Sequence, residues 1–245
     1  MMSDIVTIVW KEWKEFLLQR GSLRGAMTNL LLMVVVFGVF LPLQAGRAWL
    51  ESPMTMAAWA WLPLFLVTGM IADSFAGERE RHTLETLLAS RLADSVILLG
   101  KVAAGIGYAL VMTAILLVTA AMTVNVASWD GKFAFYPVQT LTGALVIGVL
   151  GAGLVAGLGV LVSLRAATVR QAAQSLSIGI LVLVWVPILA IQMVPREAQQ
   201  RGLSSLMAMN PRLVVPLVMV GLAVLDVLIL ALARARFQRA RLILD

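Results

Sequence analysis

Leu141 to Leu164 reads L-T-G-A-L-V-I-G-V-L-G-A-G-L-V-A-G-L-G-V-L-V-S-L. No charged side chain interrupts this stretch, and at ~1.5 Å per helical residue it exceeds the ~30 Å hydrocarbon layer of a bilayer. A helix satisfies its own backbone hydrogen bonds, so it can cross lipid without help from water. The stretch therefore predicts a membrane-spanning helix and, with it, an all-α membrane protein.

Five further apolar runs are each long enough to span a bilayer as one helix. They are Met27 to Gly46, Met54 to Ala72, Val102 to Val124, Ala173 to Val194 and Leu213 to Leu232. Of the 245 residues, 61% are hydrophobic and only 13% are charged, whereas a soluble domain carries about 25% charged residues. We expect six transmembrane helices in one domain over residues 25–245, preceded by an N-terminal segment over residues 1–24.

Lysine and arginine are unevenly divided between the two sets of connections. Fourteen of the 19 lie on one set, and five lie on the other. The richer set holds Lys11, Lys14, Arg20, Arg24, Arg79, Arg81, Arg91, Lys101, Arg165, Arg170, Arg234, Arg236, Arg239 and Arg241, and the poorer set holds Arg47, Lys132, Arg196, Arg201 and Arg212. The positive-inside rule puts the richer set in the cytoplasm. We expect a multi-pass protein of the inner or plasma membrane with both termini cytoplasmic.

The sequence argues against several classes of function. It has no cysteine and a single histidine, His82, which leaves disulfides, thiolate nucleophiles and histidine-rich metal sites unsupported. A phosphate-binding loop needs G-x-x-x-x-G-K-[ST], but Lys101 is followed by Val102 and Lys132 by Phe133. We therefore expect no enzyme activity from this chain alone. The net charge is +6. The basic residues lie in short blocks beside apolar runs, a position that indicates membrane lipids as partners rather than nucleic acid.

The segment from Ile5 to Arg20 has the pattern of an amphipathic helix. Val6, Val9, Trp10, Trp13 and Leu17 recur at helical spacing, with Lys11, Glu12, Lys14, Glu15 and Gln19 on the other face. The pattern predicts a helix in the cytoplasmic interface, with Trp10 and Trp13 at the headgroup level and Lys11 paired with Glu15. The alternative is a soluble helix packed on a partner.

The longest and most charged cytoplasmic connection covers residues 73–101. Thr83 is placed to cap a short helix, and Glu85 lies in the first turn of that helix, where the helix dipole favours an acid. Leu84, Leu87 and Leu88 form one apolar stripe. Such a stripe has to be buried, either against the bilayer or in a groove of a cytoplasmic partner.

Three further features, two inside the spans and one outside them, do not identify a function by themselves. Asp226 is the only clearly intramembrane acid, which makes it either a proton or cation relay or the partner of a basic or hydroxyl group on a neighbouring helix. Gly153-x-x-x-Gly157 allows a second helix to approach closely but does not identify it. The outer connection, residues 195–212, contains Leu203 and Leu206 among other apolar residues and predicts a short helix in the outer interface.

The stretch from Ile71 to Lys101 contains I-A-D-S-F-A-G-E-R-E-R-H-T-L-E-T-L-L-A-S-R-L, and ends in I-L-L-G-K. It resembles the segment after the second span in permease subunits of ABC transporters of the type 2 exporter family, which typically reads F-x-x-E-R-E-x-G-T-L-E-x-L-L-x-x-P and ends in G-K. His82 stands where glycine is usual, and Arg91 stands where proline is usual. The layout of six spans after an amphipathic helix is also similar to that family.

The resemblance implies a permease that dimerises with a second copy or a homologue and binds two separate ABC ATPase subunits. It implies no cofactor bound directly to this chain, with ATP and Mg on the partner ATPase. The short helix between spans 2 and 3 would be the coupling helix, seated in a groove of the ATPase. The residues that would contact the ATPase are Glu78, Arg79, Glu80, Arg81, Thr83, Leu84, Glu85, Leu87 and Leu88.

Two other functions remain open from the sequence. The chain could be an autonomous carrier driven by an ion gradient, with Asp226 as the coupling residue, although its two three-span halves show no convincing repeat. It could also be a membrane scaffold without transport. An exporter permease should copurify with an ATPase subunit, whereas a carrier should not.

Overall fold

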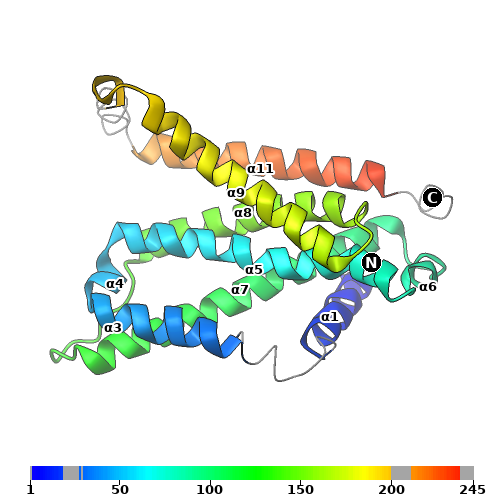
Figure 1. Cartoon of the computed structure of the whole chain (residues 1–245). Helices are drawn as coiled ribbons and strands as arrows, with labels where there is room; N and C mark the ends of the chain where they lie inside the picture. Colours follow the sequence, from blue (N-terminus) through cyan, green and yellow to red (C-terminus); the bar gives the residue numbers. More distant parts are fainter. Residues whose placement is uncertain (1, 19–27, 29, 200–210, 238–245) are drawn as a thin grey trace.

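The computed structural model describes residues 2–18, 28, 30–199 and 211–237, and every regular element within them is helical (Figure 1). Some of the residues used in the predictions lie outside the described ranges. They are Arg20, Arg24, Arg201, Leu203, Leu206, Arg239 and Arg241. The elements are α1 (Met2–Leu18), the π-helix η1 (Val34–Phe40), α3 (Leu41–Ala45), α4 (Ala48–Glu51), α5 (Pro53–Glu80), α6 (Leu84–Leu88), α7 (Asp94–Ala127), α8 (Val138–Ser163), α9 (Val169–Met193) and α11 (Pro211–Arg236).

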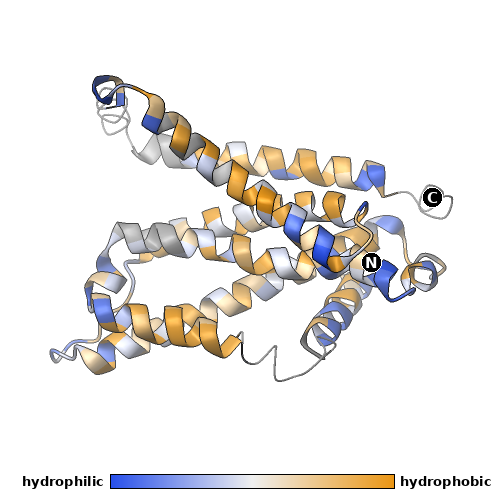
Figure 2. Ribbon diagram, viewed as in Figure 1, coloured by the Kyte–Doolittle hydropathy of each residue, from blue (hydrophilic) through white to orange (hydrophobic). Residues whose placement is uncertain are grey.

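Four helical stretches in the described residues are long and apolar enough to cross a membrane. They are Trp59–Glu80, Asp94–Ala127, Leu141–Ser163 and Pro216–Arg236, which confirms an all-α, multi-pass membrane protein. The other two predicted spans fall on the shorter apolar helix Leu30–Ala45 and on α9, so the number six stays a prediction. Figure 2 shows apolar residues along α8, α9 and α11 and hydrophilic residues gathered near α6 and α4.

The first apolar run packs closely on α7 through a π-helical segment. A side chain at Gly38 would meet Thr119 at 2.9 Å, so only glycine permits this approach. The Thr123 hydroxyl of α7 donates to the Gly38 carbonyl at 2.7 Å. A π-helix shifts carbonyl groups out of the regular i to i−4 hydrogen-bond pattern of an α-helix. Here the Gly38 carbonyl accepts a hydrogen bond from Thr123 of the neighbouring helix α7.

Glycines on α8 bring two neighbouring helices into direct contact. A Cβ atom at Gly151 would lie 2.7 Å from Leu64 of α5, and one at Gly157 would lie 2.6 Å from Ile229 of α11. The sequence predicted close packing but not its partners. The structure identifies them as α5 on one side of α8 and α11 on another.

The described helix ends gather at two opposite ends of the bundle (Figure 1). At one end, Arg47 pairs with Asp130 and donates to the Lys132 carbonyl at 3.2 Å. At the other end lie α1, α6 and the end of α11, where the rings of Phe237 and Phe75 are 5.0 Å apart. Both described chain ends therefore lie at the end that carries α6. That this end is cytoplasmic stays a prediction.

Candidate functional site

The amphipathic helix α1 is docked on the first turns of α7. The Trp13 indole donates to the Ala104 carbonyl at 2.9 Å, and Ile8 lies where a side chain at Gly100 would meet it at 2.7 Å. Phe16 packs edge-on against Tyr108 with 5.0 Å between ring centroids. Contacts within the chain thus hold α1 against α7. Small residues on α7 leave room for the large side chains of α1.

The buried face of α1 differs from the predicted one. Glu12, expected on the outward polar face, is only 8% exposed, whereas Trp10 is 71% exposed. Ile8 and Phe16, which lie one turn before and one turn after Glu12, set the face that contacts α7. Placing Glu12 on the polar face was therefore wrong, because α7 supplies a buried cation for it.

That cation is Lys101, whose side chain is fully buried. Its Nζ atom donates to Glu12 at 2.6 Å and to the Ser74 carbonyl at 2.7 Å. It also lies 3.5 Å from Glu78 and 5.2 Å from the centre of the Phe75 ring. A buried ammonium is tolerated only when paired and hydrogen-bonded, and these contacts meet that requirement with groups from α1 and α5.

Glu78 is also buried, and it links its own helix, α5, to three other elements. It accepts from Lys11 of α1 at 2.6 Å, contacts Lys101 of α7 and accepts the hydroxyl hydrogen bond of Thr83 at the start of α6. Burial alone would lower the pKa of Lys11, but its hydrogen bond and ion pair with Glu78 outweigh burial and raise the pKa above its ordinary value. Lys11 also lies 3.3 Å from Glu15, which confirms the predicted pair.

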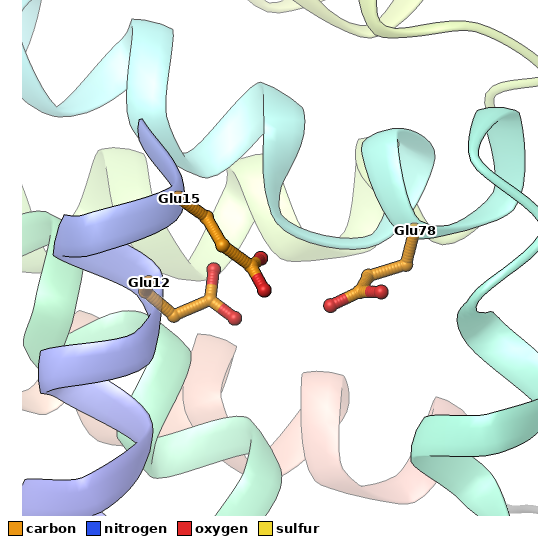
Figure 3. A group of neighbouring side chains, drawn as sticks. All are labelled: Glu12, Glu15 and Glu78. Atoms are coloured by element: carbon orange, nitrogen blue, oxygen red, sulfur yellow. The ribbon is translucent and has the colours of Figure 1, made fainter. Parts of the chain in front are cut away.

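Three carboxylates, those of Glu12, Glu15 and Glu78, converge from α1 and α5 (Figure 3). Their oxygens lie within 4.8 Å of one another, a spacing that could hold a metal ion. The Lys11 ammonium already lies among them, at 3.8 Å, 3.3 Å and 2.6 Å respectively. With Lys101 beside it, two ammonium groups face the three carboxylates, which leaves the group one formal negative charge. We call Lys11, Glu12, Glu15, Glu78 and Lys101 the ionic cluster.

Arg79 and Glu80 hold the connection between α8 and α9. The Arg79 guanidinium donates to the Ala166 carbonyl at 2.6 Å and to the Leu164 carbonyl at 2.8 Å, at the end of α8. The Glu80 carboxylate accepts from the Val169 N–H at 3.0 Å, at the start of α9. Cations suit a helix C-terminus and anions an N-terminus. These two neighbours therefore tie the end of α5 to two further helices.

The turn between α5 and α6 is built from Arg81, His82 and Thr83. Arg81 donates to Asp73 at 3.2 Å, back on α5. His82 has a φ of 56°, a left-handed conformation that favours glycine. Thr83 occupies the N-cap position but makes no side-chain cap bond, so the predicted capping was wrong. The Thr83 hydroxyl instead donates a hydrogen bond to the buried Glu78 carboxylate.

The short helix α6 buries part of its stripe inside the chain. Leu84 is 8% exposed and belongs to the main core, and Leu87 packs partly against it. The side chain of Leu88 lies outside the described residues, and Glu85 is exposed. Leu84 was expected to face a partner. This expectation was wrong, because Leu84 anchors α6 to the bundle and leaves Glu85 on the outward surface.

Ser163, at the end of α8, enters the hydrogen-bond ladder of α5. Its hydroxyl accepts from the Phe75 and Ala76 N–H groups at 3.1 Å and 2.9 Å and donates to the Ala72 carbonyl at 3.0 Å. A side chain inserted in this way opens a helix locally. The part of α5 nearest to α6 is therefore linked to α8 by a buried hydroxyl.

Asp226 lies apart from the ionic cluster, against Gly153 of α8. A Cβ atom at Gly153 would be 2.8 Å from its Oδ1 atom. That oxygen is buried and has no hydrogen-bond partner among the described residues. The predicted pairing with a basic or hydroxyl group is not found in this part of the chain. A relay role for Asp226 stays a prediction.

Sequence reasoning missed Lys101 and Glu12 as a buried pair and Ser163 as a link between helices. Lys101 was predicted as a cytoplasmic cation at the end of a motif, and its position next to a long apolar run was the available signal for burial. Glu12 has an apolar residue at i−4 and at i+4, Ile8 and Phe16, which put it on a buried face. Ser163 is the only hydroxyl in the last four turns of α8.

One comparison with known proteins gives a match. A family model described as ABC-2 type transporter matches residues 3–212, a range that runs from α1 through the spans to the start of α11. No curated protein matches the chain. The match includes every residue of the ionic cluster and all of α6.

Proposed function

Because the chain belongs to the ABC-2 type transporter family, whose membrane chains are the permease components of ABC transporters, we propose that it exports substrate with energy from ATPase subunits on separate chains. ATP and Mg would bind those subunits and not this chain. A second permease, a copy or a homologue, would complete the transport path. The exposed side of α6, with Glu85 on it, would contact the ATPase.

The observation that carries this proposal is the position of Glu78. This single buried carboxylate contacts α1 through Lys11, α7 through Lys101 and α6 through Thr83. Its neighbours Arg79 and Glu80 extend the connection to α8 and α9. A helix that receives force from a partner needs such links, because a loosely attached α6 would move without moving the spans.

The coupling step would follow from differential affinity. ATP binding favours the closed arrangement of two ATPase subunits, and any permease arrangement that fits the closed pair better gains population. A displacement of α6 would pass to α5 and α7 through Leu84 and Glu78. Packed interfaces are bistable rather than continuously deformable, so the spans would shift together.

A gradient-driven carrier is the second candidate, and one observation favours it. Asp226 has a buried carboxylate oxygen without a hydrogen-bond partner in the described part of the chain. An intramembrane acid of this kind can take up a proton or cation. Transport that needs an ion gradient but no ATP, and that Asp226→Asn abolishes, would identify this function.

To test the exporter proposal, the full chain is purified from membranes of the cells that naturally produce it. ATP hydrolysis is then measured for any ATPase subunit that copurifies with it. Glu78→Gln is compared with Lys132→Met, which changes a charge at the opposite end of the bundle. We expect both variants to retain the ATPase, because Glu85 is unaltered, and only Glu78→Gln to alter hydrolysis. Absence of an ATPase, or equal hydrolysis in all three proteins, would overturn the proposal.

A further inference from the structure

A groove of about 520 Å³ lies between the first turns of α7 and the last turns of α11. Its walls are apolar, formed by Leu98 and Leu99 of α7 and by Leu230 and Ala231 of α11. Its polar lining comes from Ser95 and Arg234. The volume is within the range of ordinary ligand sites, roughly 300 to 1,000 Å³. None of the described lining residues belongs to the ionic cluster or to α6.

Among the described residues, Arg234 is the only charged one that lines this groove. It is exposed, and it has no ion pair or hydrogen bond within the described ranges 2–18, 28, 30–199 and 211–237. The acid nearest to the groove in sequence, Asp94, is not among the described lining residues. The groove thus offers an uncompensated positive charge above an apolar floor.

Both helices that form the groove can cross a membrane. The groove lies where α7 begins and α11 ends. Because a spanning helix leaves the hydrocarbon layer near its ends, we expect the groove to open at the level of the headgroups. A ligand that fits must be negatively charged at one end and apolar at the other. A free anion would leave Leu99 and Leu230 uncovered, and a neutral lipid would leave Arg234 without a counter-charge.

We propose that this groove binds one anionic phospholipid, with the phosphate at Arg234 and the start of an acyl chain along Leu99 and Leu230. Charge complementarity selects the headgroup, because a guanidinium binds phosphate through paired N–H donors. The apolar walls select a membrane lipid over a soluble phosphate. The assignment depends only on the membrane location of the chain, so it stands whether or not an ATPase drives transport.

The test uses the full chain reconstituted in phosphatidylcholine vesicles with or without phosphatidylglycerol, followed by detergent extraction and native mass spectrometry of the retained lipid. Arg234→Gln removes the headgroup contact. Ala231→Trp fills the exposed apolar wall and leaves the charge. Arg236→Gln is the matched control, since Arg236 lies two residues away on the same helix but is not among the described residues that line the groove.

We expect wild type to retain phosphatidylglycerol in preference to phosphatidylcholine. An arginine near an anionic surface contributes about 1 kcal/mol, which corresponds to an approximately fivefold loss of retained phosphatidylglycerol in Arg234→Gln. Ala231→Trp should reduce retention of both lipids, and Arg236→Gln should match wild type. Size-exclusion profiles confirm that each variant is folded.

Three results would overturn the proposal. Equal losses in Arg234→Gln and Arg236→Gln would mean diffuse surface charge rather than a site. Displacement of phosphatidylglycerol by inorganic phosphate alone would mean a free-anion site. Unchanged retention in both Arg234→Gln and Ala231→Trp would mean that the groove is not occupied by lipid.

Discussion

The Nζ atom of Lys101 on α7 lies 2.6 Å from the carboxylate of Glu12 on α1, although 89 positions separate the two residues. This pair fixes the N-terminal amphipathic helix to the bundle at the same end as α6. The helix was expected to be seated by lipid, yet it is held by a buried ion pair and by the indole of Trp13. Its position is therefore coupled to the helices that carry the candidate coupling site.

Lys101→Met should be strongly destabilising. Removing one partner of a buried ion pair costs ~3–5 kcal/mol. Here the buried Glu12 carboxylate would lose its nearest cation, whereas Glu78 would keep Lys11. Thermal unfolding of the purified chain measures the effect, with Lys132→Met as an exposed control. The double variant Lys101→Met with Glu12→Gln should regain part of the loss. A double variant no more stable than the single one would show that the pair does not carry the effect.

Ser163→Ala should loosen the contact between α5 and α8. It would leave the Phe75 and Ala76 N–H groups without their shared acceptor, at a cost of ~1–3 kcal/mol. Thr142→Ala is the matched control on the same helix, because that hydroxyl bonds only to carbonyls within α8. Hydrogen exchange at Phe75 and Ala76 should rise only in Ser163→Ala. Equal exchange in both variants would contradict the inserted-hydroxyl interpretation.

Gly153→Ala should displace Asp226 and separate α8 from α11. The added Cβ atom would lie 2.8 Å from the carboxylate oxygen, and overpacking of this kind typically costs ~1–3 kcal/mol. Gly143→Ala, which meets nothing within 4 Å, should leave the melting temperature unchanged or slightly raised. Adding Asp226→Ala to Gly153→Ala should restore stability, and a failure to do so would place the strain elsewhere.

His82→Val should perturb the turn that leads into α6. A left-handed conformation costs an ordinary residue about 1–2 kcal/mol and is worse for a β-branched one, whereas His82→Gly removes that cost. We expect proteolysis within residues 81–84 to be faster in His82→Val than in wild type and no faster in His82→Gly. Identical cleavage rates in the two variants would mean that this backbone conformation does not hold α6.

The sequence predicted the helices far better than their contacts. Uncharged runs such as Leu141 to Leu164 identify spans directly, since the bilayer requires them. The pairing of Lys101 with Glu12 was not predictable in this way, because it depends on which helices become neighbours in the fold. Leu84 illustrates the same limit. Its periodicity showed that it must be buried, but not whether the chain or a partner buries it.

The E-R-E-R stretch was predicted as a surface for the ATPase, and its side chains instead bind within the chain. Arg79 and Glu80 contact the two ends of the α8–α9 connection, a geometry that no local pattern encodes. Glu85, by contrast, is exposed as expected. Glu78 and Leu84 are buried, whereas Glu80, Arg81, Thr83 and Glu85 are exposed. That the exposed members contact an ATPase stays a prediction.

The most direct test of the account is site-specific crosslinking from α6. The chain has no cysteine, so Glu85→Cys provides a single thiol for a maleimide photocrosslinker, and Lys132→Cys provides one at the opposite end of the bundle. The account predicts an adduct between position 85 and an ATPase subunit, altered by ATP, and none from position 132. No ATPase adduct from position 85, or equal adducts from both positions, would contradict it.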